Sequence, residues 1–248
     1  MSPKAFERSS KSNAQAGESP LAPAWHTVGV ILLLCGIVFF NLYGKLPYSA
    51  AHISPRLAGY IFVIVAEWLV VYFIWLGPRW GGASLRTLLG DAALTWRSIL
   101  RDVGLAIAFL IVANVVLGLE SFFLARYVQG PSNEAMRAFL PQGGLESTIF
   151  LLLAVTAGIC EEFIFRGYLQ RHFSGWTRSA VLGIILQGIL FGGYHAPLGL
   201  ASVITNAIGG ALLYGTLAAW RRSLRPGMIA HIAGDAIGVL VLARYFLK

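Results

Sequence analysis

The stretch TIFLLLAVTAGICEEFIFRGYLQ, residues 148–170, decides how the whole sequence is interpreted. It begins as an uninterrupted apolar run and then carries Glu161, Glu162 and Arg166 near its end. Charge inside a membrane-spanning helix is costly, and such residues generally face the protein interior or a water-filled cavity. Glu162 and Arg166 are four residues apart, which places them on one helix face and predicts an ion pair. Glu161, about 100° away around the helix, is then free to face another partner.

The composition also indicates a membrane environment. Of the 248 residues, 57% are hydrophobic and 12% are charged, whereas a soluble domain carries about 25% charged residues. The sequence therefore predicts an integral membrane protein surrounded by a lipid bilayer. The net charge of +8 comes from Lys and Arg residues scattered between apolar runs. This pattern is typical of topology signals, so we expect no nucleic-acid partner.

About seven apolar runs are long enough to cross the hydrocarbon core as helices, and they lack the alternation of barrel strands. The predicted spans are 27–43, 58–77, 103–125, 147–169, 179–195, 199–219 and 226–247. The predicted fold is thus an all-α, polytopic transmembrane helical bundle. We divide the chain into a flexible N-terminal tail (1–25), an N-terminal transmembrane region (26–145) and a C-terminal transmembrane core (146–248) that holds the last four spans.

Lys and Arg residues flank the predicted spans unevenly. If the N-terminus is inside, the inner segments hold about twice as many of these residues as the outer segments. Positive charge favours the cytoplasmic side of a membrane. The sequence therefore predicts a multi-pass protein with its N-terminus inside.

Polar side chains inside the predicted spans are few and lie mostly in the C-terminal half of the chain. They are Glu67, Asn114, Glu120, Glu161, Glu162, Arg166, Gln187, His195, Asn206, His231 and Asp235. Because each is expensive in hydrocarbon, their clustering indicates a functional core that begins near residue 146. The first three spans are expected to surround this core.

Two histidines lie in short motifs within the core. His195 ends an apolar run in FGGYHAP, residues 191–197, where two glycines allow another helix to approach closely. His231 begins the segment HIAGD, in which Asp235 lies on the same helix face and could hydrogen-bond to one ring nitrogen. Taken singly, each motif is also compatible with a purely structural role.

Together these residues suggest a reaction, provided that they meet in one cavity. A carboxylate and a histidine can deprotonate a water molecule for attack on a carbonyl carbon. A second histidine can donate a hydrogen bond to the resulting oxyanion. This is peptide hydrolysis without a covalent intermediate. The chemical alternative is a zinc site with ligands from Glu161, His195, His231 and Asp235.

In order and spacing, the motifs resemble those of the CPBP family, the CAAX-protease and bacteriocin-processing membrane proteins, also called the Abi family. The family pattern is Glu-Glu-x-x-x-Arg, then Phe-x-x-x-His, then His-x-x-x-Asn or a similar residue, on successive core helices. This chain has Glu161-Glu162-x-x-x-Arg166, Phe191-x-x-x-His195 and His231-x-x-x-Asp235.

The resemblance implies a glutamate-type intramembrane endopeptidase that uses no cofactor and cleaves a membrane-associated protein or peptide. It implies that Glu161 activates the water with the help of His195. It also implies that His231 and Asp235 lie near the oxyanion. Glu162 and Arg166 would support the site.

Position 235 departs from the eukaryotic members of the family, which have asparagine there. Asparagine can donate a hydrogen bond, whereas an ionised aspartate cannot. We therefore expect Asp235 to orient His231 rather than to bind the oxyanion. This departure and the compact chain favour a protein of the bacterial cytoplasmic membrane, with a leader peptide, bacteriocin precursor or membrane-anchor segment as its substrate.

Two other interpretations remain open. The chain could be a non-catalytic membrane chaperone or immunity protein with the same fold, or a proton-coupled transporter in which Glu and His form a relay. A simple seven-span topology also places His195 near the outer end of its span and His231 near the inner end of its own. Helix tilt, shifted span ends or an unwound stretch at 192–197 would bring the two histidines to one depth.

Overall fold

The computed structural model describes residues 22–44, 53–77, 88–90, 95–130 and 133–246, and these ranges contain helices and turns but no strand. The predicted N-terminal tail lies outside the described residues except for residues 22–25. The helical segments are α2 (Ala24–Tyr43), α3 (Pro55–Leu76), α6 (Trp96–Leu124), α7 (Asn133–Phe139), α8 (Gly144–Glu161), η1 (Glu162–Leu169), α9 (Gln170–Thr177), α10 (Ala180–Tyr194), η2 (Ala196–Leu198), α11 (Leu200–Ile208), η3 (Gly209–Gly215), α12 (Thr216–Arg221) and α13 (Arg225–Phe246). The all-α prediction is confirmed.

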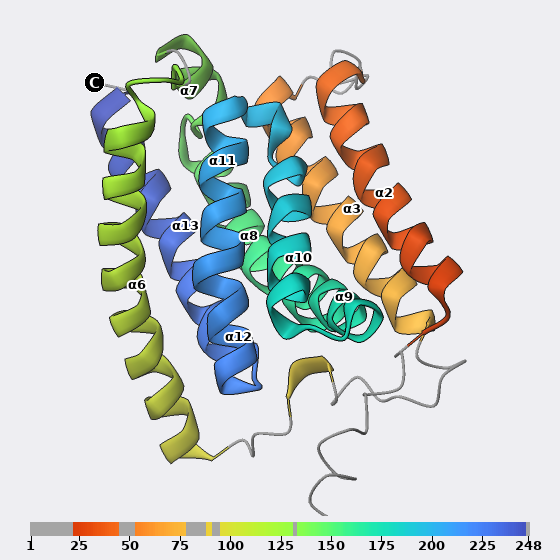
Figure 1. The fold of residues 1–248 in the computed structure, drawn as a ribbon. Coiled ribbons are helices and arrows are strands. Elements are labelled where there is room, and N and C mark those ends of the chain that lie inside the picture. Colours follow the sequence, from red (N-terminus) through yellow and green to blue (C-terminus); the bar gives the residue numbers. More distant parts are fainter. Residues whose placement is uncertain (1–21, 45–52, 78–87, 91–94, 131–132, 247–248) are drawn as a thin grey trace, which may run out of the picture.

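The long helices pack as an antiparallel bundle whose connections lie at its two ends (Figure 1). Helices α2, α6, α10 and α13 run upward in that view, and α3, α8 with α9, and α11 with α12 run downward. Ser54, Thr95 and Ser179 cap α3, α6 and α10, because each side chain accepts a hydrogen bond from a backbone N–H in the first turn. The caps fix where these passes begin.

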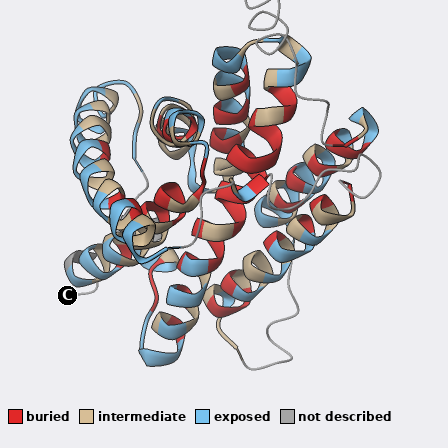
Figure 2. Cartoon of the chain, turned by 90° about the horizontal axis from the view of Figure 1, so that it is seen from below, coloured by how far each residue is buried: buried red, intermediate tan, exposed pale blue. Residues whose placement is uncertain are grey.

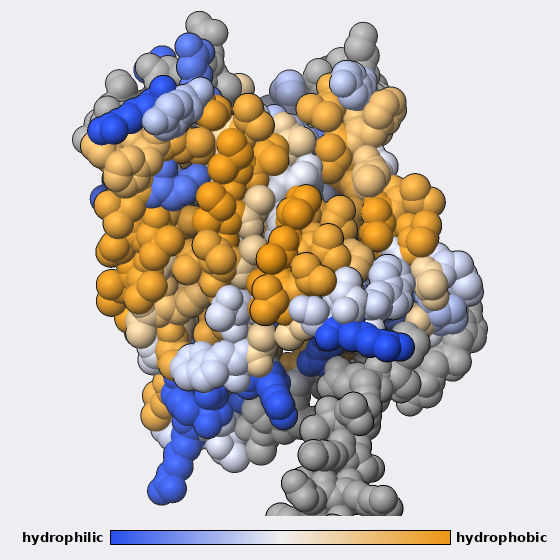
Figure 3. Space-filling model, in the orientation of Figure 1, coloured by the Kyte–Doolittle hydropathy of each residue, from blue (hydrophilic) through white to orange (hydrophobic). Residues whose placement is uncertain are grey.

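The length and hydropathy of the helices are those of membrane spans. Within the described residues, six helical segments are long and apolar enough to cross a bilayer: Ala24–Tyr43, Pro55–Leu76, Trp96–Leu124, Gly144–Thr177, Leu200–Arg221 and Arg225–Arg244. Hydrophobic side chains form a broad band between two more hydrophilic ends (Figure 3). The protein is therefore an integral membrane protein, as predicted.

The predicted span 179–195 is present as α10, an apolar helix of only 15 residues. It ends at Tyr194 because Pro197 follows closely. A proline disfavours the α conformation at the residue before it, which here is Ala196. The chain continues as the 3₁₀ turn η2 and reverses at Gly199, whose φ of 94° suits glycine. This pass therefore ends at His195, and the chain turns back into α11.

The segment α8–η1–α9 lies at the centre of the bundle. In its most apolar window 61% of the residues are buried, compared with 17–33% in the other spans. Buried residues concentrate on the helices at the centre of Figure 2, while the outer helices are largely exposed. Many of the exposed side chains are large and apolar, such as Leu32, Leu69 and Ile111. The stretch 148–170 is thus enclosed by protein, which explains how it can carry charge.

Close helix packing brings the central segment to its neighbours. A Cβ atom on Gly158 would lie 2.4 Å from a side-chain carbon of Ile232, so only glycine allows α8 and α13 to approach this closely. A Cβ atom on Gly192 would lie 2.4 Å from the Val203 carbonyl oxygen in α11. Gly193, by contrast, faces open space. The predicted close approach at FGGYHAP therefore depends on the first glycine.

Candidate active site

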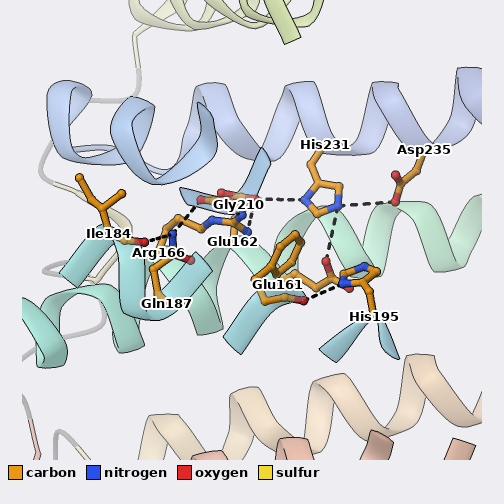
Figure 4. A network of polar contacts seen from close by, with 10 residues as sticks. Glu161, Glu162, Arg166, Ile184, Gln187, His195, Gly210, His231 and Asp235 are labelled. Atoms are coloured by element: carbon orange, nitrogen blue, oxygen red, sulfur yellow. Dashed lines mark hydrogen bonds and ion pairs between the residues drawn. The ribbon is translucent and has the colours of Figure 1, made fainter. Parts of the chain in front are cut away.

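The residues of the three sequence motifs gather around the junction of α8 and η1 (Figure 4). Three other polar residues of the predicted spans bond elsewhere: Asn114 to Leu110, Glu120 to Thr205 and Asn206 to Ser202. Glu161 ends α8, and Glu162 begins η1, a π-helical segment. Wide π-helical turns inside α-helices are frequent at functional sites. Both glutamates are buried, with 5% and 1% of their surfaces exposed. The contacts around them therefore determine which chemistry is possible.

Arg166 anchors one side of the cluster. Its Nη1 donates to Glu162 Oε1 at 2.9 Å, which is the ion pair expected from the spacing of four. Its guanidinium also lies 4.1 Å from the centre of the Phe191 ring and 5.2 Å from that of Tyr214. These contacts hold a fully buried charge between η1, α10 and η3.

The backbone of η3 completes the support of Arg166. The Gly210 carbonyl accepts a 3.4 Å hydrogen bond from Arg166 Nη2 and a 2.7 Å bond from Gln187 Nε2. A Cβ atom on Gly210 would lie 2.7 Å from Phe191 and 3.1 Å from Arg166. Glycine is therefore required there for the backbone to reach the guanidinium. No sequence motif predicted that the Gly210 carbonyl would accept these hydrogen bonds.

The His231 ring lies between three carboxylates. Its Nδ1 is 3.0 Å from Glu162 Oε1, and its Nε2 is 3.5 Å from Glu161 Oε2 and 3.7 Å from Asp235 Oδ2. An ionised carboxylate can only accept hydrogen bonds, so the Nδ1–H donates to Glu162. Acceptors also face the second nitrogen, and this arrangement suits a ring with a hydrogen on both nitrogens.

The contact geometry differs from the expected role of Asp235. The hydrogen bond that fixes the His231 ring comes from Glu162 on the neighbouring helix, whereas Asp235 lies beyond hydrogen-bond distance of Nε2. The Asp235 side chain retains 40% exposure, while that of His231 retains 11%. The cluster is therefore most open at Asp235.

His195 has the opposite hydrogen-bonding pattern to His231. Its Nδ1 is 2.9 Å from the carbonyl oxygen of Phe191, one turn earlier in α10. Since a carbonyl oxygen can only accept, Nδ1 carries the hydrogen and Nε2 keeps a lone pair. His195 is thus suited to accept a proton, whereas His231 is suited to donate one.

Phe191 shows how the two histidines reach a common depth. Its ring centre lies 4.7 Å from that of His195 and 6.3 Å from that of His231. The turn at His195 that ends α10 early and the close packing of α8 against α13 together remove the difficulty raised by a simple topology. Broken helical backbone at membrane depth is tolerated where protein surrounds it.

Glu67 is a further buried carboxylate at the site, from α3. It is 1% exposed and accepts a hydrogen bond of 3.2 Å from the hydroxyl of Tyr194, the residue before His195. The sequence pattern had marked Glu67 as a polar residue within a span, but it assigned the residue no role. Its position in the middle of an apolar run was the available signal.

The arrangement of ligands bears on the zinc alternative. Among the described residues, no group of three or more His, Cys, Asp and Glu side chains is placed so that it could hold a metal ion. Chelation of the purified protein therefore separates a zinc-dependent mechanism from a metal-free one.

The fold and the site together define a class, a multi-pass helical membrane protein that encloses carboxylates, histidines and an arginine. Residues 144–237 match the family model described as type II CAAX prenyl endopeptidase Rce1-like. This region, which contains every residue of the cluster except Glu67, is thus similar to the CAAX-protease family that its motifs resemble. Comparisons of the chain with curated proteins and with solved structures find no match.

Proposed function

We propose that the protein is an intramembrane endopeptidase that hydrolyses a peptide bond with a water molecule activated by Glu161 and His195. The observation that carries this proposal is the buried Glu161 carboxylate, 3.5 Å from Nε2 of His231, in a cluster with a second histidine of opposite hydrogen-bonding pattern. The His195 and His231 rings both lie against the Phe191 ring. The family match over residues 144–237 supports a CAAX-type membrane protease.

In the proposed mechanism, Glu161 and His195 together activate the water molecule. One proton of the water passes either to the Glu161 carboxylate or to Nε2 of His195. The water oxygen forms a bond to the scissile carbonyl carbon, whose oxygen takes the electron pair of the C=O double bond. His231 donates a hydrogen bond to this oxyanion. Collapse of the intermediate breaks the C–N bond, and the abstracted proton passes to the leaving amine.

Glu162 and Arg166 support the residues that act on the substrate. Glu162 fixes the His231 ring through Nδ1, and Arg166 neutralises Glu162 from the other side. The partly exposed Asp235 lies where a peptide would enter. For the substrate we propose a membrane-associated protein or peptide that reaches the site from the bilayer, in a bacterial cytoplasmic membrane with the N-terminus of the protein inside.

The proposal is tested with purified protein in lipid nanodiscs. A farnesylated CAAX peptide and unmodified leader-type peptides are offered, and cleavage is followed by mass spectrometry. Glu161→Gln keeps the shape of the side chain but removes the base, so kcat/KM should fall by about 10²–10⁴-fold. Glu120→Gln is the matched control, because Glu120 is also a carboxylate within a span but contacts Thr205.

The same assay separates the alternatives. Wild-type activity should persist after exhaustive chelation and dialysis. Loss on chelation with recovery on addition of zinc would replace the proposed base with a metal-activated water. No cleavage of any peptide by wild-type protein would favour a non-catalytic chaperone or a transporter. Normal turnover by a folded Glu161→Gln protein would remove Glu161 from the mechanism.

A further inference from the structure

Asp102, in the second turn of α6, is a buried carboxylate that takes no part in the candidate active site. Its Oδ2 lies 2.8 Å from Nη2 of Arg225, which begins α13. Its Oδ1 lies 3.7 Å from Nε of Arg101 and 3.9 Å from Nη2 of Arg221, which ends α12. Three helices therefore bring three arginines to one carboxylate, and we call this group the Asp102 site.

Positive charge at the Asp102 site exceeds negative charge. Three guanidinium groups against one carboxylate leave a net charge of +2. Of the three arginines, Arg225 makes the direct ion pair, while the other two lie beyond hydrogen-bond distance of the carboxylate. Nε of Arg221 and Nε and Nη1 of Arg225 are enclosed and have no hydrogen-bond partner among the described residues. The site thus holds more charge and more donors than Asp102 can satisfy.

The Asp102 site lies at the level of the lipid headgroups. Helix α6 has 29 residues, so at 1.5 Å per residue it is about 43 Å long, longer than the hydrocarbon core of about 30 Å. The extra length lies at its start, where the polar stretch WRSILRD (96–102) precedes the apolar part. Trp96 and Trp220 are exposed at this end of the bundle, as is typical of the membrane–water interface. Hydrophilic side chains gather there, below the apolar band, in Figure 3.

The chemistry of the Asp102 site suits a phosphate group. Guanidinium groups bind phosphate oxygens through paired, charge-assisted hydrogen bonds. The side chain of Arg101 is 53% exposed and that of Arg221 is 21% exposed, so both can be reached from the headgroup layer. The Arg221 guanidinium also lies 5.4 Å from the centre of the exposed Trp220 ring. Because the excess charge is positive, a lipid with net negative charge is favoured over a zwitterionic lipid.

We propose that Arg101, Arg221 and Arg225, held together by Asp102, bind the phosphate of an anionic phospholipid headgroup. Asp102 keeps the three arginines from repelling one another, and the phosphate takes up the charge that remains. The bound lipid joins α6 and α12 to the start of α13, the helix that carries His231. This inference goes beyond the proposed function and does not depend on peptidase activity.

Lipid binding to the delipidated protein in a neutral detergent tests the proposal. The protein is titrated with phosphatidylglycerol or phosphatidylcholine, and native mass spectrometry counts the bound lipids. Wild type should retain one phosphatidylglycerol in preference to phosphatidylcholine. Arg101→Gln/Arg221→Gln should weaken phosphatidylglycerol binding by about 10–30-fold, because it removes both reachable charges and leaves the pair of Arg225 and Asp102 intact.

The matched control is Arg97→Gln/Arg222→Gln. Both arginines are exposed on the same helix ends, and this variant loses the same charge without touching the partners of Asp102. It should bind phosphatidylglycerol within about threefold of wild type. Equal losses in the two double variants would reduce the effect to diffuse surface charge and overturn the site. Equal binding of the two lipids by wild type would also overturn it.

Two further measurements complete the test. If circular dichroism shows that Arg101→Gln/Arg221→Gln does not fold, Arg101→Gln alone decides, with an expected loss of about fivefold. An unchanged affinity in that variant would exclude Arg101 and refute the proposed site. Inorganic phosphate at millimolar concentration is added as a competitor and should leave the bound phosphatidylglycerol in place. Its displacement would show that the site takes free phosphate, and the lipid assignment would fall.

Discussion

Removing the guanidinium of Arg166 should destabilise the protein more than any other single change in the cluster. The Arg166 side chain is fully buried and pairs with Glu162 at 2.9 Å, itself 1% exposed. In Arg166→Leu the Glu162 carboxylate stays buried without its main partner. Breaking a buried pair from one side costs about 3–5 kcal/mol. At roughly 2–4 °C per kcal/mol for a chain of this size, the melting temperature should fall by about 6–20 °C.

A double-mutant cycle tests the reasoning behind this magnitude. If the cost comes from an uncompensated charge, Glu162→Leu/Arg166→Leu should be more stable than Arg166→Leu, because removing both charges is often nearly neutral. Arg126→Leu is the matched control, since Arg126 is exposed at the end of α6 and should change stability by only about 0.5 kcal/mol. Thermal unfolding in detergent, followed by circular dichroism, gives the five melting temperatures of wild type, Glu162→Leu, Arg166→Leu, the double variant and Arg126→Leu. Additive losses, or an Arg166→Leu protein as stable as wild type, would refute the argument.

The remaining predictions concern the rate of peptide cleavage. His195→Ala and His231→Ala should each be nearly inactive, and the double variant should be little worse than either, because residues that act as a unit are strongly non-additive. Losses that multiply cleanly in kcat/KM would show two separate functions. Asp235→Asn should lower kcat/KM by less than about tenfold, since Glu162 already fixes the His231 ring and Asp235 contributes charge from 3.7 Å. A larger loss would restore the orienting role to Asp235, and a rate at or above wild type would indicate that position 235 acts as a donor.

The sequence by itself determined the membrane class, the helical fold and the members of the cluster that lie in motifs. Continuous apolar runs leave the backbone no partner except its own helix in a bilayer, so the fold class follows directly. Charge within those runs is expensive enough to single out Glu161, Glu162 and Arg166. The ion pair between Glu162 and Arg166 followed from helix periodicity alone, because it joins residues one turn apart.

Only the tertiary structure decided the contacts between helices. The partner of His231 Nδ1 is Glu162, 69 residues away, rather than Asp235 on the same helix, and no periodicity within one helix can predict this choice. The short α10, the part that the Gly210 carbonyl plays and the hydrogen bond between Tyr194 and Glu67 likewise depend on which helix faces which. The physical reason is that burial selects partners by geometry. A charged group enclosed by protein must use whichever donor or acceptor the packing of neighbouring helices brings within reach.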